Sequence, residues 1–226
     1  MPSITASEYW HTTHPGAMIG LLELSGVDNT QSAPRLDALK REVESTLRQR
    51  YTGFTRPDFL ALPVMAAYDR YYTKFNKTYH VQLQLESLVL KGKSLPNVSP
   101  LVDSNFAAEV DTLVLTAGHD ADKLTGPIRF DVSRDGDEIV QMNGEVKTMR
   151  PGDMLMRDAD GVCCSIIYGQ DNRSPITPLT THVLYVSYAP PGVPVEAVEE
   201  QMRKIEAYVR LFSPLAVVEQ QKILVG

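Results

Sequence analysis

Two groups of residues carry side chains that bind metal ions in proteins. His11 and His14 have the spacing of half a zinc site, and His119-Asp120-x-Asp122 combines an imidazole with two carboxylates. A complete site needs further ligands, and neither group has a second cluster of such residues close by in the sequence. We therefore expect solvated loops at both places, and we predict no metal and no other cofactor.

Nucleophilic chemistry has a single sequence candidate, the pair Cys163-Cys164. The pair falls in a predicted strand, where neighbouring side chains face opposite sides. We expect one thiol in the core and the other half-exposed, with neither acting as a nucleophile. The segment Gly92-Lys93-Ser94 resembles the end of a phosphate-binding loop, but position 87, where the first glycine belongs, holds Ser87.

Apolar residues at helical spacing predict four helices. The first two begin near Pro34 and Pro63, because proline is tolerated in a first helical turn. The third, Val81–Lys91, also alternates like a strand, but Gly92 at a C-cap position favours a helix. The fourth is Val195–Phe212. The second helix carries an aromatic stripe that we expect in the core: Tyr68, Tyr71 and Tyr72.

Strands crowd the middle of the chain, while helices lie before and after them. Asn143-Gly144 predicts a hairpin with a type I′ turn. This segregation is typical of an α+β fold rather than of alternating strands and helices. The expected strands are Ala17–Leu24, Thr112–Thr116, Pro127–Val132, Glu138–Met142, Glu145–Met149, Met154–Arg157, Val162–Tyr168 and His182–Tyr188.

Composition excludes several classes of protein. Hydrophobic residues make up 43% and charged residues 22% of 226 residues, which is ordinary globular composition. No apolar run reaches the roughly 18 residues of a membrane helix, and the N-terminus lacks the pattern of a signal peptide. The net charge of −6 argues against a broad nucleic-acid surface but allows contact with a single-stranded end. Two adjacent cysteines fit a reducing compartment. We therefore expect a cytoplasmic protein with no DNA or membrane partner.

An ordered set of short motifs follows in the middle of the chain. The motifs are Lys91–Pro96, Leu101-Val102-Asp103-x-Asn105, Asp120–Phe130, Pro151–Asp158 and Gln170–Thr177 followed by Thr180. Together they resemble the B3/B4 domain, which occurs in the phenylalanyl-tRNA synthetase beta subunit and in stand-alone proteins. The resemblance runs from about residue 63 to residue 188, and we expect the whole chain, residues 1–226, to form one such domain.

The resemblance implies a six-stranded, barrel-like and mostly antiparallel β core with flanking helices. It also implies a tRNA-editing activity, in which water hydrolyses the ester that joins a wrong amino acid to the 3′-terminal adenosine of a tRNA. Such a site has to position water and stabilise an oxyanion. The partners would be a tRNA acceptor end and its amino-acid moiety. The chain contains no synthetase core, so we do not expect it to charge tRNA.

The resemblance suggests three catalytic candidates. His119 would contact the attacking water or the terminal ribose, although the family histidine aligns with Ala117. Gln170 aligns with a pocket glutamate of the synthetase, and Asp171 is a nearby substitute that would orient water or the substrate ammonium. Stand-alone relatives usually carry an arginine where this chain has Gly169.

Four further residues are candidates for binding substrate. Arg173 would contact the terminal phosphate. Thr177 and Thr180 would line the amino-acid pocket or bond the backbone of their turn, and both alternatives are open. Asn105 lies in the same motif as Asp103, which we interpret as a structural residue that braces the loop behind the pocket.

Two functions remain open at this point. One is a trans-acting aminoacyl-tRNA deacylase, favoured by the ordered pocket motifs. The other is a non-catalytic module that binds an RNA end, an amino acid or another small metabolite, favoured by Gly169 and the displaced histidine.

Overall fold

The computed structural model describes residues 3–30 and 32–226, and its strands form three sheets. All strand pairs are antiparallel except β1 with β4. The five-stranded sheet has the order β1 (Ile4–Ala6), β4 (Ile128–Val132), β7 (Met154–Asp158), β8 (Gly161–Ser165) and β9 (Gly169–Gln170). The four-stranded sheet has the order β11 (Val217–Val225), β2 (Met18–Ser25), β10 (Val183–Ala189) and β3 (Thr116–Asp120). The hairpin pairs β5 (Glu138–Val140) with β6 (Val146–Thr148).

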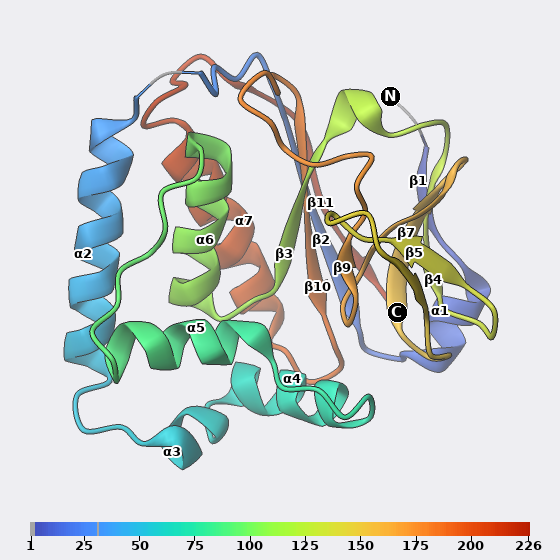
Figure 1. Cartoon of the computed structure of the whole chain (residues 1–226), viewed down its shortest axis with the longest axis horizontal. Helices are drawn as coiled ribbons and strands as arrows, with labels where there is room; N and C mark the ends of the chain where they lie inside the picture. Colours follow the sequence, from blue (N-terminus) through green and yellow to red (C-terminus); the bar gives the residue numbers. More distant parts are fainter. Residues whose placement is uncertain (1–2, 31) are drawn as a thin grey trace.

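The helices gather mainly on one side of the four-stranded sheet, and the five-stranded sheet lies on the other side (Figure 1). Contacts of α7 with β2 and β10, and of α6 with β3, join the helical layer to that sheet. No helix in the described ranges is long and apolar enough to span a membrane. The helices are α1 (Glu8–Thr13), α2 (Pro34–Arg50), α3 (Arg56–Leu60), α4 (Pro63–Thr73), α5 (His80–Val89), α6 (Pro100–Thr112) and α7 (Val195–Val209).

The core is centred on β10, whose seven residues are all buried because both of its faces and both of its edges are covered. The tyrosines that form the aromatic stripe of α4 are buried in the core, as the helical spacing predicts. Its hydroxyl groups have partners: Tyr68 donates to the Tyr188 carbonyl at 2.6 Å, and Tyr71 donates to Asp153 at 2.6 Å. These bonds offset the desolvation of the phenol groups.

The α+β class and the mostly antiparallel pairing are confirmed. The described strands close no barrel, and they divide into sheets of five, four and two strands instead of one six-stranded core. The two larger sheets approach each other where β3 meets the loop after β9. There an isolated bridge joins His119 to Pro175, and the Asp120 amide donates to the Ser174 carbonyl at 2.9 Å. This single bridge does not extend into a hydrogen-bond ladder, so the two sheets remain separate.

Two expectations about local structure were wrong. Both thiols of Cys163-Cys164 are buried, because both faces of β8 are covered. The hairpin at Asn143-Gly144 forms, but only Gly144 has a positive φ, at +84°, and its amide donates to the Gln141 carbonyl at 2.8 Å. This is the pattern of a three-residue loop with a glycine bulge, not of a type I′ turn.

The sequence prediction also missed α6 and misplaced the strand after it. Thr112, expected to start a strand, ends the helix, and β3 begins at Thr116. Leu113 makes the reversal between them in the left-handed region, at φ +66°. The amphipathic pattern fails in α6 because its buried residues surround the helix: Leu101, Asp103, Ser104, Asn105, Ala107, Ala108, Glu109 and Val110.

Candidate functional site

A cavity of about 450 Å³ lies where α5, α6, β3 and the β8–β9 turn meet. This volume is within the range of about 300–1,000 Å³ that is typical of small-molecule sites. The walls are mainly apolar, and the polar atoms among them are few. The lining residues are His80, Val98, Val102, Asn105, Phe106, Leu115, Thr116, Ala117, Gly118, Met142, Cys164, Ser165, Ile166, Gly169, Gln170, Ile176 and Tyr188.

Two buried polar atoms of the cavity residues have no hydrogen-bond partner in the described structure. The Asn105 amide is oriented by its Nδ2, which donates to the Thr116 carbonyl at 2.8 Å, and this leaves Oδ1 unpaired. The Tyr188 hydroxyl has no nitrogen or oxygen partner and lies beside the Cys164 thiol, and burial, together with this thiol, raises its pKa well above the ordinary value. An unpaired buried polar atom costs about 1–3 kcal/mol. These two atoms therefore suit a ligand that brings its own donor or hydroxyl group.

His80 is a functional candidate that the sequence analysis did not identify. It begins α5 and lines the cavity. The Tyr72 hydroxyl donates to the Ile166 carbonyl at 3.0 Å, so His80 Nδ1, 3.2 Å from that hydroxyl, has to be the donor between them. His80 Nε2 is then a free acceptor, with no partner among the described residues. His80 is an exposed residue, but desolvation of its ring beside Tyr72 and Tyr79 lowers the pKa of His80, so the imidazole is neutral at pH 7. A lone histidine without a motif gave no sequence signal.

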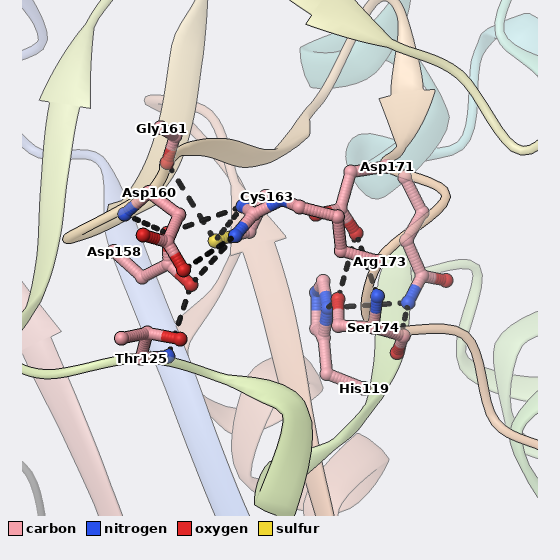
Figure 2. Close-up of polar contacts among 10 residues, drawn as sticks. His119, Thr125, Asp158, Asp160, Gly161, Cys163, Asp171, Arg173 and Ser174 are labelled. Carbon is pink, nitrogen blue, oxygen red and sulfur yellow. Dashed lines mark hydrogen bonds and ion pairs between the residues drawn. The ribbon is translucent and has the colours of Figure 1, made fainter. Parts of the chain in front are cut away.

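The predicted residues His119 and Asp171 lie together, joined by Ser174 (Figure 2). His119 Nδ1 is 2.8 Å from the Ser174 hydroxyl, which donates its own proton to Asp171 Oδ1 at 2.7 Å. Nδ1 therefore carries the imidazole proton, and Nε2 is a buried acceptor without a partner. Burial lowers the pKa of His119 to about 3, which keeps the ring neutral. His119 is 0% and Asp171 1% exposed, and neither lines the cavity.

Gln170 connects this buried chain to the cavity. Its Nε2 donates to the carbonyl groups of Gly118 and Ser174, at 2.9 Å each, and it lies 3.1 Å from His119 Nδ1. Both amide protons are thus used by carbonyls, and the side chain is fixed as a piece of the cavity wall. Of the three predicted catalytic residues, only Gln170 reaches the cavity.

Arg173 lies at the half-buried end of the same cluster, among acidic residues (Figure 2). Its guanidinium forms two 3.1 Å bonds with Asp158, lies 2.9 Å from Asp171 Oδ2 and is 3.7 Å from Asp160. Burial opposes the charge, yet the bonds to Asp158 hold the pKa of Arg173 above its ordinary value. Three carboxylates surround this cation, so its charge is already balanced within the protein.

The remaining predicted residues have structural partners. Thr180 Oγ1 accepts from the Thr177 amide at 2.9 Å and donates to Asp120 at 2.8 Å, so this pair bonds its own turn and lines no cavity described here. Asp103 braces the loop behind the cavity, as predicted: it accepts from Lys40 Nζ at 2.6 Å and from the Val98 amide at 2.9 Å.

The two departures from the family pattern both lie on the cavity wall. Ala117 and Gly169, at the positions where the family resemblance leads us to expect histidine and arginine, are lining residues. A Cβ at Gly169 would meet nothing within 4 Å, so this part of the cavity is open space. In the described ranges, no group of three or more His, Cys, Asp or Glu residues is arranged to hold a metal ion.

Comparison with known proteins assigns the chain to a family. A structure of an N-terminal fragment of the phenylalanyl-tRNA synthetase beta subunit from Pyrococcus horikoshii has a TM-score of 0.49 and 11% identity. The alignment covers 98% of this chain and 50% of that one, so the chain spans about half the length of the fragment. No curated protein sequence matches. The model of the B3/4 domain matches residues 64–208, more than half of the sequence, and the chain therefore belongs to the B3/4 domain family.

Proposed function

We propose that this protein hydrolyses, in trans, the ester of a mischarged tRNA and holds the amino-acid moiety in the 450 Å³ cavity. The observation that carries the proposal is the pair of unpaired buried polar atoms there, Asn105 Oδ1 and the Tyr188 hydroxyl, beside the imidazole of His80. Membership of the B3/4 family, which includes a tRNA-editing domain, supports the same substrate class.

The cavity offers complementary surfaces to an aminoacyl group. Its apolar walls fit an apolar or aromatic side chain, whose burial is favourable at about 25 cal/mol per Å². Asn105 Oδ1 is an acceptor for the substrate ammonium, and the Tyr188 hydroxyl pairs with a polar atom at the end of the side chain. A site with unpaired buried groups discriminates strongly against analogues that lack the matching group.

Hydrolysis needs a group that accepts a proton from water, and His80 is the neutral base on this wall. The water oxygen attacks the ester carbonyl carbon while its proton passes to Nε2. The bond from the carbonyl carbon to the ribose oxygen then breaks, and the ribose oxygen takes the proton. His119, Ser174 and Asp171 act as positioning residues, because His119 and Asp171 hold the Ser174 hydroxyl and the Ser174 carbonyl accepts from the amide of Gln170.

Contact with RNA is confined to the acceptor end in this proposal. The net charge of −6 leaves few cations for phosphates, so binding should weaken only modestly as salt is raised. Arg173 is not available as a phosphate contact while Asp158, Asp160 and Asp171 surround it.

A specific observation favours the alternative, a binding module without hydrolysis. Gly169 leaves the cavity wall bare where relatives carry an arginine, and the buried His119 and Asp171 do not reach a bound ester directly. A module of this kind would bind the aminoacyl end through Asn105 and Tyr188 and release it unchanged.

The test is release of labelled amino acid from a complete panel of charged tRNAs. We expect at least one mischarged tRNA to be hydrolysed above the buffer rate, and His80→Gln to slow it by about 100-fold. His11→Gln, in α1, is the matched control and should leave the rate unchanged. Since the pKa of His80 is lowered, the wild-type rate should be constant near pH 7 and fall only below the ordinary value of 6.5.

His80→Gln should lack this inflection. If the panel shows no hydrolysis but a non-hydrolysable aminoacyl-tRNA analogue binds, the deacylase proposal is wrong and the binding module replaces it.

A further inference from the structure

A second cavity, of about 460 Å³, lies beside the first and has no role in the proposal so far. Leu83 and Leu88 of α5 and Phe106 of α6 provide apolar walls. Polar groups of the lining come from His80, Gln84, Ser87, Lys93 and Ser94. A cavity with apolar walls and a few polar groups is typical of a small-molecule site.

The two cavities are neighbours that share lining residues. His80 and Phe106 line both. An ester held at His80 with its acyl group in the first cavity therefore directs its alcohol component toward the second. In an aminoacyl-tRNA, that component is the terminal nucleotide.

The polar groups of the second cavity match a nucleotide in type. Gln84 Oε1 is buried and has no hydrogen-bond partner in the described structure, so it can accept from an exocyclic amine. Lys93 Nζ is paired with no described carboxylate. The Lys93 backbone is held, because its amide donates to the Ser87 carbonyl at 3.0 Å and its carbonyl accepts from Arg48 at 2.8 Å. An anchored, unpaired cation beside an apolar slot suits a phosphate.

We infer that the second cavity binds the terminal nucleotide of the substrate, an aminopurine nucleoside 5′-phosphate, with the base between α5 and Phe106. Gln84 accepts from the exocyclic amine, and Lys93 contacts the 5′-phosphate. This inference rests on the proposed function, since it assigns the second half of the same substrate, but the nucleotide binds without any ester being present.

The experiment uses adenosine 5′-monophosphate as the probe and the full chain as the receptor. Titration followed by amide NMR should shift the signals of residues 83–95 and give tighter binding than adenosine. Lys93→Glu should weaken AMP binding by about tenfold and abolish its advantage over adenosine. Lys91→Glu is the matched control: Lys91 is an exposed lysine two positions away that lines neither cavity, and its replacement should change little.

A second pair of probes tests Gln84. Inosine 5′-monophosphate replaces the exocyclic amine with a carbonyl, so wild type should bind it about tenfold more weakly than AMP. Gln84→Leu should bind both nucleotides equally. If Lys93→Glu and Lys91→Glu have the same effect, or if AMP shifts signals elsewhere, the inference is wrong.

The outcomes separate the two proposals. If the AMP results hold while no charged tRNA is hydrolysed, the nucleotide site stands and the deacylase fails. If a charged tRNA is hydrolysed while AMP does not bind and Lys93→Glu keeps the full rate, the deacylase stands and the nucleotide site fails.

Discussion

Two groups of polar residues lie next to each other in this protein, and the side chain of Gln170 separates them. On one side, His119, Ser174 and Asp171 are buried, Arg173 is half-buried, and the polar groups of this region are almost fully paired. On the other side, the cavity holds unpaired atoms of Asn105 and Tyr188. The motif Gln170–Ser174 belongs mainly to the paired region, whereas the unpaired atoms belong to Asn105, in the motif Leu101–Asn105, and to Tyr188, which lies in no motif.

The comparison separates two uses of buried polar groups. A group whose bonding capacity is used within the protein stabilises a particular backbone arrangement. A group left unpaired lowers stability, and that cost is recovered only when a ligand completes the bond. The paired region should therefore respond to mutation in folding, and the cavity should respond in binding.

The largest expected effect is on the paired region. Arg173→Met would leave Asp158, whose side chain is fully buried, and Asp171 without their cation. Removing one partner of a buried ion pair costs about 3 kcal/mol, so the urea midpoint should fall sharply. Arg203→Met, which breaks an exposed pair with Glu200, is the control and should leave the urea midpoint almost unchanged. Equal losses of stability in Arg173→Met and Arg203→Met would contradict the idea that the paired region contributes to folding.

A smaller effect is expected at Glu109. This buried residue of α6 accepts one hydrogen bond, from the Thr116 amide at 2.9 Å. Burial raises its pKa from 4.5 to about 8. For a carboxyl with a raised folded-state pKa, stability is full below the unfolded value and is lost as pH rises toward the folded one.

Glu109→Gln removes this titration and keeps an acceptor for the amide. We expect the variant to gain about 2 kcal/mol of unfolding free energy relative to wild type between about pH 5 and pH 8. Denaturant unfolding at a series of pH values measures this gain. If the difference in unfolding free energy between Glu109→Gln and wild type stays constant with pH, titration of Glu109 is not its cause.

The smallest effect comes from two tyrosines of the same strand, each 1% exposed. The Tyr185 hydroxyl donates to the Leu101 carbonyl at 2.8 Å, so Tyr185→Phe should cost about 1 kcal/mol. The Tyr188 hydroxyl has no partner, so Tyr188→Phe should be neutral or slightly stabilising. Thermal unfolding of both variants decides the matter, and a larger loss for Tyr188→Phe would mean that its hydroxyl is not an unpaired cavity group.

Elements with one-sided burial were predictable from the sequence. The helices starting at Pro34 and Pro63, the final helix and the hairpin at Asn143-Gly144 all have apolar periodicity or a specific turn signal, and all are present. His119 and Asp171 lie together through Ser174, but both are buried and line none of the described cavities.

Other features had no local signal. In α6, polar residues such as Asn105 and Glu109 are buried by tertiary partners, which removes the stripe that marks a helix. Whether His119 is exposed depends on the loop after β9, which packs over it only in the folded chain. The role of His80 depends on Tyr72, whose bond to the Ile166 carbonyl fixes the imidazole tautomer.

The hairpin β5–β6 contributes an exposed part of the cavity lining, whereas other lining residues project from the packed core. Met142, at the hairpin tip, lines the cavity and is 63% exposed, whereas Asn105, Gln170 and Tyr188 project from the packed core. Each hairpin strand has three residues, and Gln141 fastens the tip to the Tyr168 carbonyl at 2.6 Å. Sequence changes in the hairpin can therefore alter the range of ligands while the polar groups of Asn105, Gln170 and Tyr188 stay unchanged, much as variable loops diversify a common scaffold.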